Sequence, residues 1–157
     1  LPICYSHCMI EETKTIQKSD LPQLAQEVLR AAKDVHLDRA VIIALHGDLG
    51  AGKTTFVQSL AATLGVTEHV TSPTFTIMKG YETTDDVFQT LIHMDAYRID
   101  DESELAPLRF NEILQTPRTL FCIEWAEKIT GALPTNIIHL TLNGVDENTR
   151  TAHLSYS

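Results

Sequence analysis

The sequence predicts a three-layer α/β fold in which a central, mostly parallel sheet carries antiparallel additions. Three observations predict it. An apolar strand-like run from Ala40 to Leu45 leads into a glycine-rich loop and then into an amphipathic helical run. Further apolar runs of strand length lie along the rest of the chain, one of which ends in an acidic residue at Glu124. No internal repeat, low-complexity tract or linker divides the 157 residues, so we expect one domain.

The first half of the chain predicts two strands and two helices. Residues 1–12 are expected to be a flexible N-terminal extension to a domain spanning 13–157, with Thr13 to Gln17 as a short edge strand. Ser19 or Asp20 then caps a helix of nearly regular apolar period. Its apolar positions are Leu21, Leu24, Val28, Leu29, Ala32 and Val35. The strand at 40–45 follows, and after the glycine-rich loop a second helix ends at Gly65, a residue typical of that position.

The second half predicts shorter elements. We expect two short helices between Asp100 and Gln115, broken at Pro107, and a hairpin connection from Gly80 to Asp86. The predicted strands are Phe75 to Tyr81, Leu91 to Tyr97, Thr119 to Ile123, Ile137 to Leu142 and Thr151 to Tyr156.

Charge and hydropathy exclude some classes of function. With 43% hydrophobic and 21% charged residues, the chain has the composition of a globular protein, and its formal net charge is −9. Direct binding to DNA or RNA normally needs a basic surface, so any role with nucleic acid is expected to pass through a partner. No apolar run approaches the roughly 18 residues of a membrane span, and the N-terminus lacks a signal-peptide pattern. We therefore expect a cytoplasmic protein without a membrane partner.

The cysteines do not predict a metal site. Cys122 lies within a strand-like apolar run and is expected to be a small core residue. Cys4, His7 and Cys8 cluster near the N-terminus, but a structural zinc site needs about four ligands and no second pair at suitable spacing follows.

The glycine-rich loop carries the strongest functional signal. Residues Gly47 to Thr54 satisfy G-x-x-x-x-G-K-[ST], and they stand between a strand and a helix, as a P-loop does. The glycines allow main-chain N–H groups to converge on phosphate oxygens, and the helix directs its positive end at the same anion. Lys53 would add a cation for the β- and γ-phosphates, and Thr54 a hydroxyl for Mg²⁺. The expected phosphate-binding positions are Gly47, Asp48, Leu49, Gly50, Ala51, Gly52, Lys53, Thr54 and Thr55.

Hydrolysis needs a carboxylate beside the phosphates, and two strands offer one. The apolar run Leu120 to Ile123 ends in Glu124, and a similar run from Leu91 ends in Asp95. Either acid could also be a solvated residue at a strand end.

Several neighbours could assist these carboxylates. His93, Asp95 and Tyr97 are spaced by two, so they are predicted to share one face of a strand. Arg98 follows and could stabilise phosphoryl charge or hold a carboxylate. Thr74, in the loop after the P-loop helix, could sense the γ-phosphate, although a simple turn at Ser72 and Pro73 explains that segment equally well.

Taken together, these motifs resemble the bacterial TsaE family, also called YjeE. The matching segments are the P-loop with Thr55, Ser72 to Phe75, His93 to Arg98, and Ile123 to Lys128, and the similarity extends over roughly residues 13 to 156. The P-loop alone is common to many nucleotide-binding proteins, whereas its combination with H-x-D-x-Y-R and I-E-W-x-E-K is highly specific.

The resemblance implies an ATPase of tRNA threonylcarbamoyladenosine biosynthesis that acts on a heterodimer of TsaB and TsaD and meets tRNA only through that complex. It implies that the P-loop and Lys53 hold the phosphates and that Thr54 and Glu124 hold Mg²⁺. Asp95 is the other acidic position tied to hydrolysis. Thr55, Thr74, Arg98 and Trp125 occupy matching motif places. The stretch Leu21 to Gln23 lacks the threonine that family members often place near the base, so it implies no base contact.

Other functions remain open from the sequence. A small-molecule kinase would need an acceptor pocket and an arginine-rich lid, but the arginines are scattered, at Arg30, Arg39, Arg98, Arg109, Arg118 and Arg150. A GTPase is disfavoured because neither N-K-x-D nor D-x-x-G occurs. A nucleotide-gated assembly module, in which ATP binding matters and turnover is incidental, would carry the same motifs.

Overall fold

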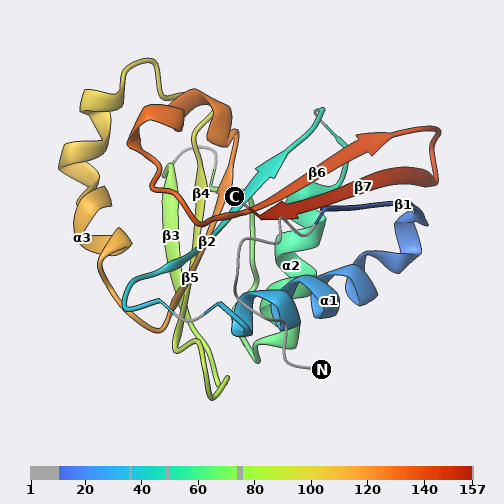
Figure 1. Ribbon diagram of the computed structural model, residues 1–157, viewed down its shortest axis with the longest axis horizontal. Coiled ribbons are helices and arrows are strands. Elements are labelled where there is room, and N and C mark those ends of the chain that lie inside the picture. The colour runs from blue at the N-terminus through green and yellow to red at the C-terminus, as the bar shows by residue number, and fades with distance from the viewer. Residues whose placement is uncertain (1–10, 36, 49, 74–75, 157) are drawn as a thin grey trace.

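The structure of the chain, a computed structural model, describes residues 11–35, 37–48, 50–73 and 76–156. The described part contains one seven-stranded sheet in the order β1-β7-β6-β2-β5-β4-β3 (Figure 1). Its strands are β1 (Glu11–Gln17), β2 (Val41–His46), β3 (Met78–Glu82), β4 (Thr90–Asp95), β5 (Thr119–Glu124), β6 (Ile138–Gly144) and β7 (Thr149–Tyr156). The four central strands β6, β2, β5 and β4 are parallel, whereas β7, β1 and β3 pair antiparallel with their neighbours. The predicted sheet type is confirmed.

Helices cover both faces of this sheet, which makes the three layers that the sequence predicts. On one face lie α1 (Leu21–Lys33) and α2 (Lys53–Thr63), and on the other α3 (Phe110–Leu114) with the 3₁₀ helices η2 (Glu102–Leu108) and η3 (Ala126–Ala132) (Figure 1). A further 3₁₀ turn, η1 (Lys18–Asp20), joins β1 to α1. Each face has its own hydrophobic core, so the sheet is buried between the two.

The alternation of side chains along β2 divides it between these cores. Ile43 and Leu45 pack in the core beneath α1 and α2, whereas Ile42 and Ala44 pack in the core beneath α3 and η2. All four are fully buried, which is why this strand reads as a continuous apolar run. Cys122 on β5 is a free, buried core residue, as predicted.

The region of β3 and β4 differs from the prediction. β3 begins at Met78, because the strand conformation cannot continue through Ile77, whose φ is 65°. Phe75, the predicted first residue of this strand, lies outside the described residues. Gly80 lies within β3, so the connection to β4 is later than predicted. β4 ends at Asp95, since its Oδ1 accepts a hydrogen bond from the Tyr97 N–H at 2.9 Å and turns the chain.

The break in the helical region after β4 also lies elsewhere than predicted. Pro107 stands inside η2, whereas the break is at Arg109, whose φ of 57° ends η2 and precedes α3. The prediction of Pro107 as the breaking residue was therefore wrong, because proline is compatible with the short 3₁₀ segment and the left-handed residue is what stops it.

Helix α1 begins where predicted, but its capping differs. Asp20 is the N-cap residue, yet its carboxylate accepts a hydrogen bond from the Gln17 N–H at 2.9 Å rather than from the helix. β1 begins at Glu11 rather than Thr13 and pairs with β7 over its whole length. Residues 1–10, with Cys4, His7 and Cys8, lie outside the described residues. Among the helices of the described part, none is both long and apolar enough to cross a membrane.

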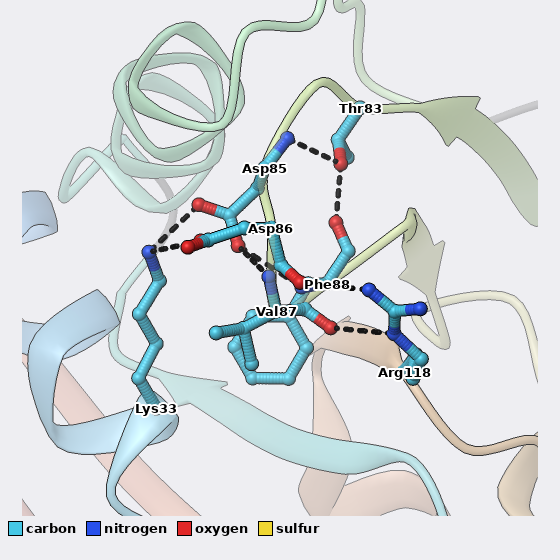
Figure 2. Close-up of polar contacts among 7 residues, drawn as sticks. All are labelled: Lys33, Thr83, Asp85, Asp86, Val87, Phe88 and Arg118. Carbon is cyan, nitrogen blue, oxygen red and sulfur yellow. Dashed lines mark hydrogen bonds and ion pairs between the residues drawn. The ribbon is translucent and has the colours of Figure 1, made fainter.

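A polar network anchors the β3–β4 connection at the end of the sheet where β4 and β5 begin (Figure 2). Lys33 at the end of α1 donates to Asp85 at 2.7 Å, and the other Asp85 oxygen accepts the Val87 and Phe88 N–H groups. Arg118 donates to the Asp86 carbonyl at 2.7 Å. This network lies at the amino ends of the parallel strands, so it stabilises the fold away from the end where ligands bind in such sheets.

Candidate functional site

The P-loop leaves the carboxyl end of β2 and leads into α2. β2 ends at His46, and α2 begins at Lys53, with Gly52 as its N-cap at a φ of 107°. Gly47 has a φ of 125°, and a Cβ on it would lie 1.8 Å from the Leu142 carbonyl oxygen of β6. Only glycine fits there, because both its conformation and the close approach of β6 exclude a side chain. The strand–loop–helix context predicted for this motif is confirmed.

The Lys53 ammonium lies within the curl of this loop. Its Nζ donates to the Gly47 carbonyl at 2.6 Å and to the Asp48 carbonyl at 3.0 Å, and it lies 4.8 Å from the centre of the Trp125 ring. The residue is only 6% exposed. A buried cation with neutral carbonyl and aromatic partners is well suited to an incoming anion, which would be a stronger acceptor than either carbonyl.

A threonine–carboxylate pair lies beside the lysine. Thr54, in the first turn of α2, donates its hydroxyl to Glu124 Oε1 at 3.1 Å. Glu124 is the last residue of β5 and is 3% exposed. Its second oxygen, Oε2, is 3.1 Å from Nε2 of the fully buried His93 on β4. The two predicted magnesium ligands are thus in contact, and His93 holds the carboxylate from the other side.

Hydroxyl and carboxylate oxygens are ligands that suit Mg²⁺, which normally keeps several waters and shares its remaining positions with substrate phosphates. Thr54 and Glu124 therefore fit a metal held jointly with a nucleotide. Among the described residues, no three His, Cys, Asp or Glu side chains gather into a metal-binding group of their own. The chemistry of this pair thus indicates a site that a phosphate would complete.

Asp95 lies next to Glu124 because β4 and β5 pair in register at these two residues. It is 9% exposed, and burial is the main cause that raises its pKa above the ordinary value of 3.8. The Tyr97 N–H lowers the pKa, the negative charge of Glu124 raises it, and His93 and Lys53 lower it slightly, so the net direction is upward. Two acids thus stand side by side at the carboxyl end of the sheet.

The raised pKa makes ionised Asp95 unfavourable for folding. An acid with a higher pKa in the folded state contributes stability below its unfolded pKa and loses that contribution as the pH rises through the folded value. We therefore expect Asp95→Asn, without nucleotide or Mg²⁺, to raise the melting temperature at pH 7. The gain should shrink as the pH falls towards 3.8.

Asp85 supplies a matched control of opposite sign for this measurement. Burial raises its pKa, but the hydrogen bonds from Lys33 and from the Phe88 and Val87 amides outweigh it and lower the pKa below 3.8. Asp85→Asn should therefore lower the melting temperature at pH 7. A pH-independent effect of Asp95→Asn, or a loss of stability at pH 7, would contradict the electrostatic picture of Asp95.

Two other predicted residues, Tyr97 and Arg98, lie in the loop after β4. Tyr97 is outside β4 and 54% exposed, so the prediction that it shares a strand face with His93 and Asp95 was wrong; the turn made by Asp95 removes it. Its ring packs on Trp125, with centroids 5.1 Å apart. Arg98 is exposed in the same loop.

The other predicted phosphate-binding positions belong to the loop or the adjoining helix. Asp48 and Gly50 are exposed in the loop, and Thr55 is exposed in the first turn of α2. Leu49 and Thr74 lie outside the described residues, so their predicted roles stay predictions.

Sequence reasoning missed two features beside the loop. His46, the last residue of β2, stacks on His139, near the start of β6; His46 Nε2 lies 3.0 Å from His139 Nδ1, and His46 Nδ1 lies 3.2 Å from Glu127 Oε2. Burial, together with the neighbouring His46, lowers the pKa of His139 below 6.5. Arg150 on β7 reaches the P-loop carbonyl of Ala51 at 3.0 Å. Neither has a local sequence signal, since both arise from strand pairing.

Comparisons with known proteins agree on one family. The family model described as "Threonylcarbamoyl adenosine biosynthesis protein TsaE" matches residues 15–152. A Bacillus subtilis protein named tRNA threonylcarbamoyladenosine biosynthesis protein TsaE is 40% identical over 109 residues, which are 69% of this chain and 65% of that protein. A protein of the same name from Aquifex aeolicus is 34% identical over 148 residues, or 93% of this chain and 96% of its own length. A crystal structure of YdiB from Bacillus subtilis superposes with a TM-score of 0.69 at 26% identity, covering 96% of this chain and 88% of that one.

Proposed function

The chain belongs to the TsaE family of threonylcarbamoyl adenosine biosynthesis proteins, and we propose that its part in this pathway is to bind and hydrolyse ATP. The observation that carries the proposal is the contact between Thr54 and Glu124 beside the Lys53 ammonium. A hydroxyl, a carboxylate and a cation at the end of a P-loop are the groups that a magnesium nucleotide requires. The cation and the hydroxyl come from the start of α2, and the carboxylate comes from the end of β5.

In this proposal each side chain has a separate task. Lys53 exchanges its carbonyl partners for phosphate oxygens, because a charge-assisted hydrogen bond is the stronger one. Thr54 and Glu124 hold Mg²⁺, which when bound neutralises charge that develops on the phosphates during transfer. Asp95, an acid of raised pKa next to Glu124, orients the attacking water or accepts a proton from it. Arg98 stabilises phosphoryl charge, and Thr74 senses the γ-phosphate.

The partner proposal follows from charge as well as from the family. With a net charge of −9, the chain is poorly suited to approach tRNA by itself. We propose that it acts in the cytoplasm on a heterodimer of TsaB- and TsaD-type proteins and reaches tRNA only through that complex. Coupling to such partners would make ATP turnover depend on their presence.

An ATPase assay with and without the TsaB–TsaD heterodimer tests this function against its rivals. Strong stimulation of phosphate release by the heterodimer is expected for an ATPase that drives the complex. Turnover that does not change with the heterodimer, together with tight ATP binding, would instead favour a nucleotide-gated assembly module. Transfer of the γ-phosphate to an added small-molecule acceptor would favour a kinase.

Replacing Asp95 separates binding from hydrolysis in the same assay. Asp95→Ala should leave the dissociation constant of ATP nearly unchanged and lower the partner-stimulated rate by about 100-fold or more, the range for loss of a proton-accepting group. Titration calorimetry and phosphate release measure the two effects. Loss of ATP binding by the same factor would show that Asp95 holds the ligand instead.

A further inference from the structure

Arg150 connects the P-loop to the hairpin formed by β6 and β7. Its Nε donates to the Ala51 carbonyl oxygen at 3.0 Å, and its Nη1 donates to the carbonyls of Asp146 at 2.7 Å and Thr149 at 2.9 Å. The residue is 7% exposed. One buried guanidinium, 99 positions after Ala51 in the sequence, thus joins the phosphate-binding loop to the turn between β6 and β7.

The hairpin also contacts the start of the P-loop. Gly47 lies so close to Leu142 of β6 that a Cβ would stand 1.8 Å from the Leu142 oxygen. The main chain of β6 therefore fixes the entry of the loop, while Arg150 of β7 contacts the loop near its exit. The two contacts are independent of each other, and each places the β6–β7 hairpin against the main chain of the loop that would bind phosphate.

The hydrogen bond from Arg150 to the Ala51 carbonyl restricts the orientation of one peptide unit of the P-loop. It belongs to the same planar trans peptide unit as the Gly52 N–H, so the oxygen and the amide hydrogen point to opposite sides of that unit. Gly52 has a φ of 107°, and a glycine permits the rotation that would turn this peptide over. The hydrogen bond from Arg150 opposes such a rotation, because turning the peptide would move the Ala51 oxygen away from Nε.

We propose that Arg150 is a positioning residue for the nucleotide: it fixes the Ala51–Gly52 peptide so that the Gly52 amide faces the phosphates. This rests on the proposed function, since it names how the same site is held ready for its ligand. Arg150 acts through the loop and does not touch the nucleotide.

Arginine suits this task better than lysine. Its planar fork donates from Nε to the P-loop and from Nη1 to the turn at the same time, whereas a lysine ammonium would have to choose one position. A buried cation is costly unless its donors find acceptors, and here carbonyl oxygens of two segments accept from Nε and Nη1. Nη1 makes the bonds within the turn, so the bond from Nε to Ala51 is the one that links the turn to the site.

The test compares Arg150→Lys and Arg150→Met with the control Asp146→Ala. Asp146 Oδ1 accepts the Asn148 and Thr149 N–H groups at 2.9 and 2.8 Å, so its loss loosens the same turn without removing the bond to Ala51. Calorimetry with ATP and Mg²⁺ gives the dissociation constant, and thermal unfolding gives the melting temperature. Steady-state kinetics with the heterodimer separates KM from kcat.

Both Arg150 variants should weaken ATP binding by about 10- to 100-fold, the equivalent of one hydrogen bond to a charged group. KM should rise while kcat at saturating ATP changes little, because the misplaced amide affects ground state and transition state alike. Asp146→Ala should lower the melting temperature and leave the dissociation constant within about twofold. If Arg150→Met fails to fold, Arg150→Lys decides, since it keeps the charge and most of the side chain.

Two results would overturn the inference and leave the proposed function intact. One is a folded Arg150 variant that binds ATP as tightly as the wild type; the other is an Asp146→Ala variant that loses the same factor of affinity. If the wild-type protein itself shows no ATP binding, the proposed function fails and this inference fails with it.

Discussion

Replacing Lys53 with alanine should abolish measurable retention of ATP. The ammonium is buried within the loop, where it can form two hydrogen bonds to phosphate oxygens in place of its two carbonyl partners. Hydrogen bonds to charged groups contribute roughly 1.5–3 kcal/mol each, so the dissociation constant should rise at least about 100-fold. Titration calorimetry with ATP and Mg²⁺ measures this change.

Two further variants separate charge from packing at this position. Lys53→Met keeps the aliphatic stem beside Trp125 but removes the ammonium, and it should lose nearly as much affinity as alanine. Lys79→Met removes the same charge from an exposed position on β3 and should leave affinity within about twofold. Near-normal ATP binding by Lys53→Met would contradict a phosphate contact by the ammonium.

Replacing Glu124 should mainly lower Mg²⁺-dependent turnover. A metal bound to phosphate supplies several kcal/mol of charge stabilisation, so loss of its protein carboxylate should slow hydrolysis by about 100-fold or more. Glu124→Ala also leaves the buried His93 Nε2 without its partner and should reduce stability. Glu124→Gln keeps the size and an acceptor for Thr54, so it is the better variant for the rate measurement.

Glu112→Gln is the matched control for Glu124. It makes the same chemical change on α3, at an exposed side chain that has no proposed role in the site. Turnover should remain near the wild-type rate. If Glu124→Gln hydrolyses ATP at an unaltered rate over a range of Mg²⁺ concentrations, Glu124 is not the metal carboxylate.

The P-loop and its carboxylate could be predicted from the sequence because both are local patterns. Gly47 to Thr54 form a continuous motif, and Glu124 directly follows the apolar residues of its own strand. The neighbourhood of Asp95 and Glu124 follows from parallel strands that end at the same edge of the sheet. In each case, one short segment and the rules of parallel sheets were sufficient to predict where the residue lies.

The features that could not be predicted depend on contacts between distant segments or on side-chain bonds in turns. Arg150 reaches Ala51 only because β7 pairs with β6, which in turn pairs with β2. Tyr97 leaves the strand because the Asp95 carboxylate accepts its N–H, and a spacing of two residues does not reveal that bond. The hydrogen bond that Asp95 accepts thus ends the strand, and it removes Tyr97 from the strand face predicted to carry His93 and Asp95.

A calorimetric titration of the wild-type chain with ATP in the presence of Mg²⁺ tests the central claim most directly. We predict a saturable heat of binding at one site, for the chain alone or together with the TsaB–TsaD heterodimer, and loss of that heat in Lys53→Ala. The absence of any heat of binding under both conditions would contradict nucleotide binding and, with it, every role proposed for the residues around the P-loop.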